Sequence, residues 1–219
     1  FQDGVSISRS RASVVELFDL ERVEVVKGPQ GTLFGRGAEI GAVHVIRNKP
    51  TNVLSGELSV GYGSYNQKLA SGYINTPFAE GKLANRFALS YNARDGFIKN
   101  LSGGRLNGKS TIALRNSTRY WLGDKTTAYL VFDYQYDDYP GTSFKSKTFA
   151  PAGGDTDPNS AADLEQGEGL YIKRHVGGAA FLLDHELNAN WKLSSITGFR
   201  AFDSDESFDA DGTPAPILW

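Results

Sequence analysis

The stretch from Glu21 to Thr51 reads ERVEVVKGPQGTLFGRGAEIGAVHVIRNKPT. Its outer parts, ERVEVV and AVHVIR, alternate apolar and polar side chains, as half-buried β-strands do. The part between them is rich in glycine and contains a proline, so it predicts tight turns. The sequence therefore predicts a small unit built from two half-buried strands, which leads into a chain of a different pattern.

The chain beyond Asn52 consists of long alternating segments separated by turn-rich stretches. Each segment is long enough for the roughly 9 to 11 tilted residues with which a β-strand crosses a bilayer. No run of about 18 apolar residues is present, so we expect no membrane-spanning helix here. The seven predicted strands cover residues 54–63, 68–78, 83–93, 111–122, 126–137, 171–187 and 191–203.

The alternation gives most of these segments one apolar and one polar face. In the third segment Phe87 and Leu89 lie on one face and Arg86 on the other, and in the fourth Leu114 opposes Arg115. A lipid-facing side and a polar, lumen-facing side explain this pattern in a transmembrane barrel. The pattern of the second segment does not assign its faces.

The connections alternate in length along the chain. Residues 79–82, 123–125 and 188–190 are predicted short turns, whereas residues 94–110 and 138–170 are long and rich in Gly, Asp, Ser and Pro. Only residues 64–67 form a short link on the long-loop side. Short turns on one rim and long loops on the other are typical of outer-membrane barrels, whose long loops are extracellular.

The quoted stretch resembles the TonB-dependent outer-membrane receptors. The resemblance depends on the ERVEV run at residues 21–25, GPQGTLFGR at 28–36, GAV at 41–43 followed by Val45 and Ile46, and the closing Lys49-Pro50. The chain departs from the family where Ile40, and not a second glycine, precedes Gly41. In this family the run ends the plug domain that fills the barrel lumen.

The resemblance implies a mainly β fold. Residues 1–51 would be the C-terminal part of a small α/β plug, and residues 52–219 the N-terminal part of a transmembrane antiparallel β-barrel. Family barrels have about twenty-two strands, so seven strands leave about two thirds of the barrel outside this chain. The chain contains no methionine. We therefore expect it to be a processed or truncated piece that lacks the front of the plug and its TonB-binding motif.

The resemblance also implies a function, namely TonB-dependent active uptake of a scarce nutrient across the bacterial outer membrane. Ferric siderophores are the commonest cargo of the family, and oligosaccharide, haem and cobalamin are alternatives. The implied partners are TonB with ExbB and ExbD, outer-membrane lipid and lipopolysaccharide. A passive porin or a soluble β-sheet binding module would share part of the strand pattern, but neither needs the GPQGTLFGR stretch.

Two groups of candidate site residues follow from the resemblance. The first is the plug apex, where two arginines with interleaved hydroxyls can hold an anionic chelate, although a solvated basic turn fits the same sequence. The second is a set of plug charges that can pair with the barrel wall or remain solvated. The apex residues are Ser8, Arg9, Ser10 and Arg11, and the plug–barrel contacts are Glu21, Arg22, Glu24 and Arg36.

Composition excludes several other classes. With 23 basic and 25 acidic residues the net charge is -2, which gives no reason to expect a nucleic-acid partner. The absence of cysteine excludes disulfides and thiolate metal sites. The glycine-rich stretch lacks the GxxxxGK spacing of a phosphate loop. Aromatic residues near segment ends favour interfacial girdles.

No catalytic or metal-binding constellation stands out. The three histidines are far apart in the sequence, and no HExxH, CxxC or nucleophile-elbow motif is present. The tail stretch Asp209-Ala-Asp211-Gly212 resembles part of a calcium loop but lacks the closing glutamate. We therefore expect neither an enzyme nor a cofactor or metal site.

Overall fold

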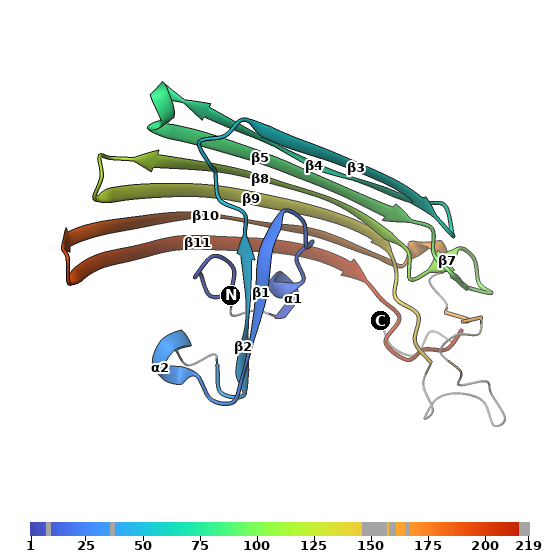
Figure 1. Ribbon diagram of the computed structural model, residues 1–219. Helices are drawn as coiled ribbons and strands as arrows, with labels where there is room; N and C mark the ends of the chain where they lie inside the picture. Colours follow the sequence, from blue (N-terminus) through green and yellow to red (C-terminus); the bar gives the residue numbers. More distant parts are fainter. Residues whose placement is uncertain (8–9, 36–37, 146–156, 158–160, 165–166, 215–219) are drawn as a thin grey trace.

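The computed structural model describes residues 1–7, 10–35, 38–145, 157, 161–164 and 167–214. A two-stranded hairpin near the N-terminus lies against a seven-stranded antiparallel sheet, and a small two-stranded unit sits among the loops at one end of that sheet (Figure 1). Within the described residues, none of the helices has the length and apolar character needed to cross a membrane.

The quoted stretch forms the N-terminal hairpin. β1 (Leu20–Lys27) pairs with β2 (Gly41–Arg47) in antiparallel register, with Val23 opposite Val45 and Val25 opposite Val43. Two short helices, α1 (Ser10–Ser13) and α2 (Gly31–Phe34), precede and interrupt it. At Gly41 a Cβ atom would lie 2.6 Å from the carbonyl oxygen of Val26, so the hairpin requires glycine at this position.

The seven predicted strands are confirmed in one sheet. Their spatial order is β11-β10-β9-β8-β5-β4-β3, and every neighbouring pair is antiparallel. The strands predicted at residues 126–137 and 191–203 extend furthest beyond their predicted ends, to Pro140 and Ser207, because their backbone pairing continues into polar residues. The strands are β3 (Ser55–Gly63), β4 (Gln67–Phe78), β5 (Leu83–Arg94), β8 (Lys109–Trp121), β9 (Thr126–Pro140), β10 (Tyr171–Asn188) and β11 (Trp191–Ser207).

The sheet has an apolar outer face and a polar inner face. On β9, Leu130 and Phe132 are exposed on the outer face, whereas Gln135 and Asp137 are buried on the inner face. Much of the outer face is apolar, as expected of a lipid-facing surface. Its exposed aliphatic and aromatic side chains include Leu58, Ile74, Phe87, Leu89, Ile112, Phe181 and Phe199.

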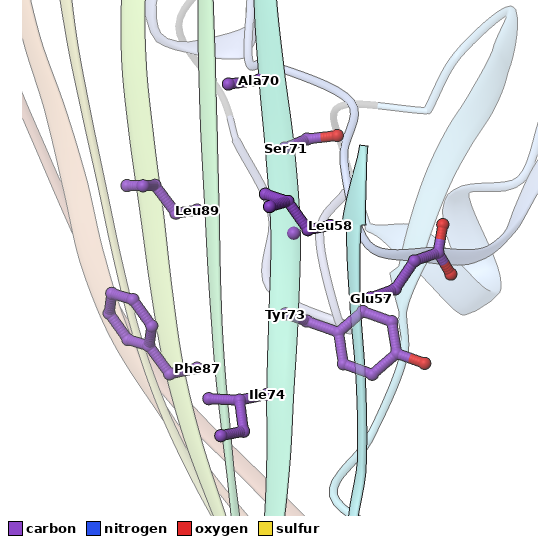
Figure 2. Close-up of a pocket in the computed structure, with 9 residues that line it drawn as sticks. Glu57, Leu58, Ala70, Ser71, Tyr73, Ile74, Phe87 and Leu89 are labelled. Carbon is purple, nitrogen blue, oxygen red and sulfur yellow. The ribbon is translucent and has the colours of Figure 1, made fainter. Parts of the chain in front are cut away.

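The structure also assigns the faces of β4, which the sequence pattern left open. Ile74 lies on the same side as Phe87 and Leu89, whereas Tyr73 and Glu57 lie on the opposite side (Figure 2). Gly72 contributes no side chain to the outer face, so a shallow apolar hollow forms there between the neighbouring leucines, Ile74 and Phe87. β4 therefore follows the same inside–outside alternation as its neighbours.

The connections divide between the two rims as predicted. The turns that join β4 to β5, β8 to β9 and β10 to β11 lie at one end of the sheet, and the first of them contains the short helix η1 (Ala79–Gly81) (Figure 1). The long connections lie at the other end. They contain β6 (Ile98–Lys99), β7 (Arg105–Leu106) and the short helix η2 (Gly167–Gly169).

The long loops share a small core of their own, which their polar composition did not predict. Buried side chains from both loops pack together there, and Asn100 ties the loops to each other through the backbone of Leu164. The Asn100 amide donates to the Leu164 carbonyl at 3.1 Å and its oxygen accepts from the Leu164 N–H at 2.8 Å. The core residues are Ile98, Leu106, Ala162, Leu164 and Leu170.

The N-terminal hairpin lies on the concave side of the curved sheet, and β1 and β2 run across the direction of the sheet strands (Figure 1). The chain then passes from β2 to β3 at the edge of the sheet. This placement brings the described residues before β1 against the polar inner face. The division into a plug of residues 1–51 and a barrel of residues 52–219 stays a prediction.

Candidate functional site

The inner face of the sheet contacts the N-terminal segment, which is the part of the chain before β1, through a series of ion pairs. Each pair joins a carboxylate of the segment to a cation on β5 or β8. These cations occupy alternate positions that point inward, because residues two apart on a strand share a face. The pairs are Asp3 with Arg115, Glu16 with Lys109, and Asp19 with Arg86.

Two of these pairs are buried. The side chains of Arg115 and Asp3 are 1% and 6% exposed, with Nη2 of the arginine 2.7 Å from Oδ2 of the aspartate. Arg86 donates from Nε to Oδ2 of Asp19 at 2.9 Å and from Nη2 to Oδ1, so this pair is bidentate. Removing one partner from such a buried pair costs roughly 3–5 kcal/mol, because the other charge stays buried without compensation.

Neighbouring groups fix the geometry of these pairs. The guanidinium of Arg86 stacks over the ring of Tyr73, with its Cζ 3.5 Å from the ring centroid. The amide of Asn48 donates to Oδ1 of Asp19 at 3.1 Å. Glu16 accepts from Asn92 at 3.0 Å as well as from Lys109 at 2.8 Å. Each carboxylate is therefore held by groups from more than one element.

Arg174 on β10 binds the backbone of the N-terminal segment. Its Nη1 donates to the carbonyl of Arg11 at 2.5 Å and its Nη2 to the carbonyl of Val14 at 2.7 Å. Nε donates to Oδ2 of Asp137 at 2.8 Å. That carboxylate also accepts hydrogen bonds from Thr111, Gln135 and Tyr139. Since the contacts to the segment are made through carbonyl groups, they do not depend on which side chains the segment carries.

Arg47 at the end of β2 secures the segment from the other side. It donates to the carbonyl of Glu16 at 2.8 Å and to that of Phe18, and it stacks on the Phe18 ring. Burial, together with the nearby positive charge of Arg115, lowers the pKa of Arg47 to about 10. At neutral pH it is still a cation, so the interface holds two buried guanidiniums side by side.

The predicted apex residues are placed only in part. Ser8 and Arg9 lie outside the described residues, and Ser10 begins α1. Arg11 is described: its guanidinium, 58% exposed, pairs with Glu206 on β11. Arg11 therefore contacts the sheet near the long-loop rim. Ligand binding by the four apex residues stays a prediction.

The predicted plug–barrel contacts form a different arrangement in this chain. Arg22 pairs with Glu21 and Glu24 along the exposed face of β1, with 2.7 Å between Nε and Oε1 of Glu24. The hydrogen bond from Arg22 lowers the pKa of Glu24. Arg36 lies outside the described residues. Contacts of these four residues with barrel strands beyond this chain stay a prediction.

Sequence reasoning did not single out Asp3, Glu16 and Asp19. A signal was available, because Glu16 and Asp19 are acidic residues within a segment that is otherwise apolar, VVELFDL. The inward-facing arginines of the fourth predicted strand were recognised as lumen-facing. Their partners lie 67 to 112 residues away in the sequence, so only the fold shows the pairing.

Comparison with known proteins adds the family. Residues 1–42 match the model of the TonB-dependent Receptor Plug Domain. The ferric yersiniabactin uptake receptor FyuA from Yersinia pestis superposes with a TM-score of 0.82 at 18% identity, over 96% of this chain and 32% of that one. The chain is thus similar to the TonB-dependent receptors, by sequence in its plug-domain match and by fold over most of its length.

Two further similar proteins come from Pseudomonas aeruginosa. The metal-pseudopaline receptor CntO is 31% identical over 127 residues, which make up 58% of this chain and 17% of CntO. The ferripyoverdine receptor bound to ferripyoverdine superposes with a TM-score of 0.77 at 20% identity, over 98% of this chain and 29% of that one. The chain thus spans less than a third of the length of these receptors.

Proposed function

We propose that the receptor containing this chain actively imports a ferric siderophore across the outer membrane of a Gram-negative bacterium. The observation that supports this most is the set of ion pairs that hold the N-terminal segment on the inner face through Asp3, Glu16 and Asp19. An inner face covered in this way is blocked at rest, so transport needs a step that releases the segment. A passive porin has no use for such a fastening.

The energetics of the interface favour a driven process. Loss of one partner from a buried ion pair costs roughly 3–5 kcal/mol, and the Asp3–Arg115 and Asp19–Arg86 pairs both fall in this class. Arg174 adds charge-assisted hydrogen bonds to the same segment. Thermal fluctuation alone would release the segment rarely. TonB, energised by ExbB and ExbD, is the partner that the family supplies for this step.

The outer face supports a position in the membrane. Its exposed apolar side chains, among them Leu58 at 77% and Phe199 at 69%, would be costly in water. Hydrocarbon would cover them in a bilayer, and lipopolysaccharide would contact the outer leaflet part of the surface. A soluble binding module would bury this face against a second layer. We propose no enzymatic activity for the receptor.

The class of cargo is supported by the relatives. Their names specify metal-pseudopaline, ferric yersiniabactin and ferripyoverdine as the molecules that those receptors take up or bind. All three are metal chelates. Oligosaccharide, haem and cobalamin remain the alternative cargoes that transport measurements must separate.

The test is uptake of radioactive iron by iron-starved cells. Cells that lack the receptor gene, and the same cells carrying the full-length receptor, would be given ferripyoverdine, ferric yersiniabactin or iron-loaded pseudopaline. We expect receptor-dependent uptake of at least one chelate, abolished by a protonophore or by loss of TonB. Uptake only of haem, cobalamin or an oligosaccharide would overturn the siderophore assignment, and uptake that persists without TonB would overturn the active mechanism.

A further inference from the structure

The inner face of β5 and β8 carries basic residues and no acidic ones. Neither strand contains an aspartate or glutamate anywhere along its length. The register places the basic side chains on the same face, with Arg86 opposite Ser117, Arg115 opposite Ala88, and Arg94 opposite Lys109. Two adjacent strands thus form a positively charged strip, and its counter-charges must come from elsewhere.

Three of these cations find their carboxylates on the N-terminal segment. We call Arg86, Lys109 and Arg115 the inner cationic stripe; their ion-pair partners are Asp19, Glu16 and Asp3. The arginines on the next strands differ in this respect. Arg174 pairs with Asp137 and Arg200 with Asp133, and both carboxylates belong to β9 of the sheet itself. Departure of the segment would therefore leave the stripe, and not β10 or β11, without carboxylates.

Arg115 keeps N–H donors that make no hydrogen bond even when the N-terminal segment is in place. Its Nη2 serves Asp3 and Tyr129, but Nε and Nη1 are buried and have no hydrogen-bond partner among the described residues. A small hollow beside it, also lined by Arg47 and Asp133, has room for about one water molecule. A guanidinium that is 1% exposed and only partly used is equipped to hold more anionic oxygen than the segment supplies.

We propose that the inner cationic stripe is a track for the carboxylates of an anionic cargo, which Asp3, Glu16 and Asp19 occupy at rest. The stripe extends along β8 from Lys109, near the long-loop rim, to Arg115, and continues to Arg86 beside Ser117. At about 3.3 Å per residue, the first two cations are about 20 Å apart along the strand. That the anion is the imported chelate rests on the proposed function.

The exchange has a physical rationale. Removing the carboxylate partner of a buried cation is costly, because the positive charge then stays buried without a counter-charge. A cargo that carries carboxylates replaces the lost ion pairs as the segment withdraws. The released state is then closer in free energy to the resting state than it would be with the cations unpaired. A neutral or cationic cargo gives no such compensation. The stripe therefore selects by charge in addition to any selection made at the outer vestibule.

The test uses the full-length receptor, in a cysteine-free background, within isolated outer membranes that have no energy supply. Ser117→Cys places one thiol on the inner face next to Arg86; this chain contributes no other cysteine. Asp3→Asn with Asp19→Asn removes the resting carboxylates without changing side-chain size. Two thiol reagents of similar size are compared, the anionic sulfonatoethyl and the cationic trimethylammonioethyl methanethiosulfonate.

With the carboxylates removed, we expect the anionic reagent to react about 10-fold or more faster than the cationic one, relative to their rates with glutathione. Adding Arg86→Gln and Arg115→Gln should abolish the preference. Lys68→Gln, which removes a charge from the outward-facing side of β4, should leave it intact. Equal rates, a preference that survives loss of both arginines, or a thiol that neither reagent reaches would each overturn the track. Because no transport is involved, failure of uptake would count only against the proposed function.

Discussion

At the scale of single residues, the interface between the plug and the sheet depends on charges that are buried and therefore hard to remove singly. Arg174 is an informative case, because it links Asp137 of the sheet to the carbonyls of Arg11 and Val14. Its side chain is nearly inaccessible, and so is that of Asp137. Loss of Arg174 removes the hydrogen bonds to these two carbonyls and also leaves the buried Asp137 carboxylate without its cation.

Arg174→Gln is therefore expected to destabilise the plug by roughly 3–5 kcal/mol. In the full-length receptor, the urea concentration at which protease begins to cleave residues 1–50 should fall. Lys173→Gln is the matched control, because the neighbouring lysine is exposed on the other face of β10. A cleavage midpoint that is the same in both variants would show that Arg174 does not hold the segment.

The Asp19–Arg86 pair offers a second test at this scale. Asp19→Asn and Arg86→Gln should each destabilise the plug, and the double variant should lose less than the sum. A coupling free energy of about 1–3 kcal/mol is expected for a bidentate buried pair. A double-mutant cycle on the same urea midpoints measures it. Strict additivity, within about 0.3–0.5 kcal/mol, would mean that the two groups do not interact in the membrane.

At the scale of elements, the long loops behave as a packed unit and not as separate solvated segments. The hairpin of β6 and β7 shares a hydrophobic core with the stretch around Leu164, and Asn100 satisfies both backbone groups of that leucine. This shared core holds the two loops in a fixed position relative to each other.

Asn100→Ala is expected to loosen both loops together. The buried N–H of Leu164 would lose its partner, at a cost of about 1–3 kcal/mol, and the Leu164 C=O would keep only the Gly167 N–H. Hydrogen exchange should accelerate at residues 96–108 and 161–170, with the sheet unchanged. Asn190→Ala, in an exposed turn on the opposite rim, is the control. Acceleration in only one loop would contradict a shared core.

At the scale of the whole molecule, the sheet and the N-terminal part of the chain are held by two different kinds of contact. The seven sheet strands are joined by continuous backbone hydrogen bonding between neighbours. The segment before the hairpin contacts that sheet through side-chain ion pairs and hydrogen bonds. The proposed transport, in which the segment is released while the sheet stays intact, would depend on this difference.

The difference predicts a hierarchy of local opening. In the membrane-embedded receptor, amides of residues 20–47 should exchange faster than those of residues 111–137. Asp3→Asn with Asp19→Asn should accelerate exchange in the first region at least several-fold and leave the second unaffected. Hydrogen-exchange mass spectrometry would measure both. Equal protection of the two regions would contradict a separately releasable plug.

Sequence alone determined the strands, the faces of most of them and the two rims, whereas the faces of β4 came from the structure. A strand residue reports its own environment, so alternation at every second position places Phe132 outward and Gln135 inward without knowledge of any neighbour. The plug hairpin was equally readable, because its turns depend on local glycine chemistry.

Only the tertiary structure decided which charges meet. Asp3 and Arg115 are 112 residues apart, and Arg174 reaches Arg11 across 163. Nothing local distinguishes Asp3, which pairs with the wall, from Glu21, which pairs with its neighbour Arg22. Ionic partnership depends on distance in space, and that distance is set by the curvature of the sheet and by the path of the plug across it.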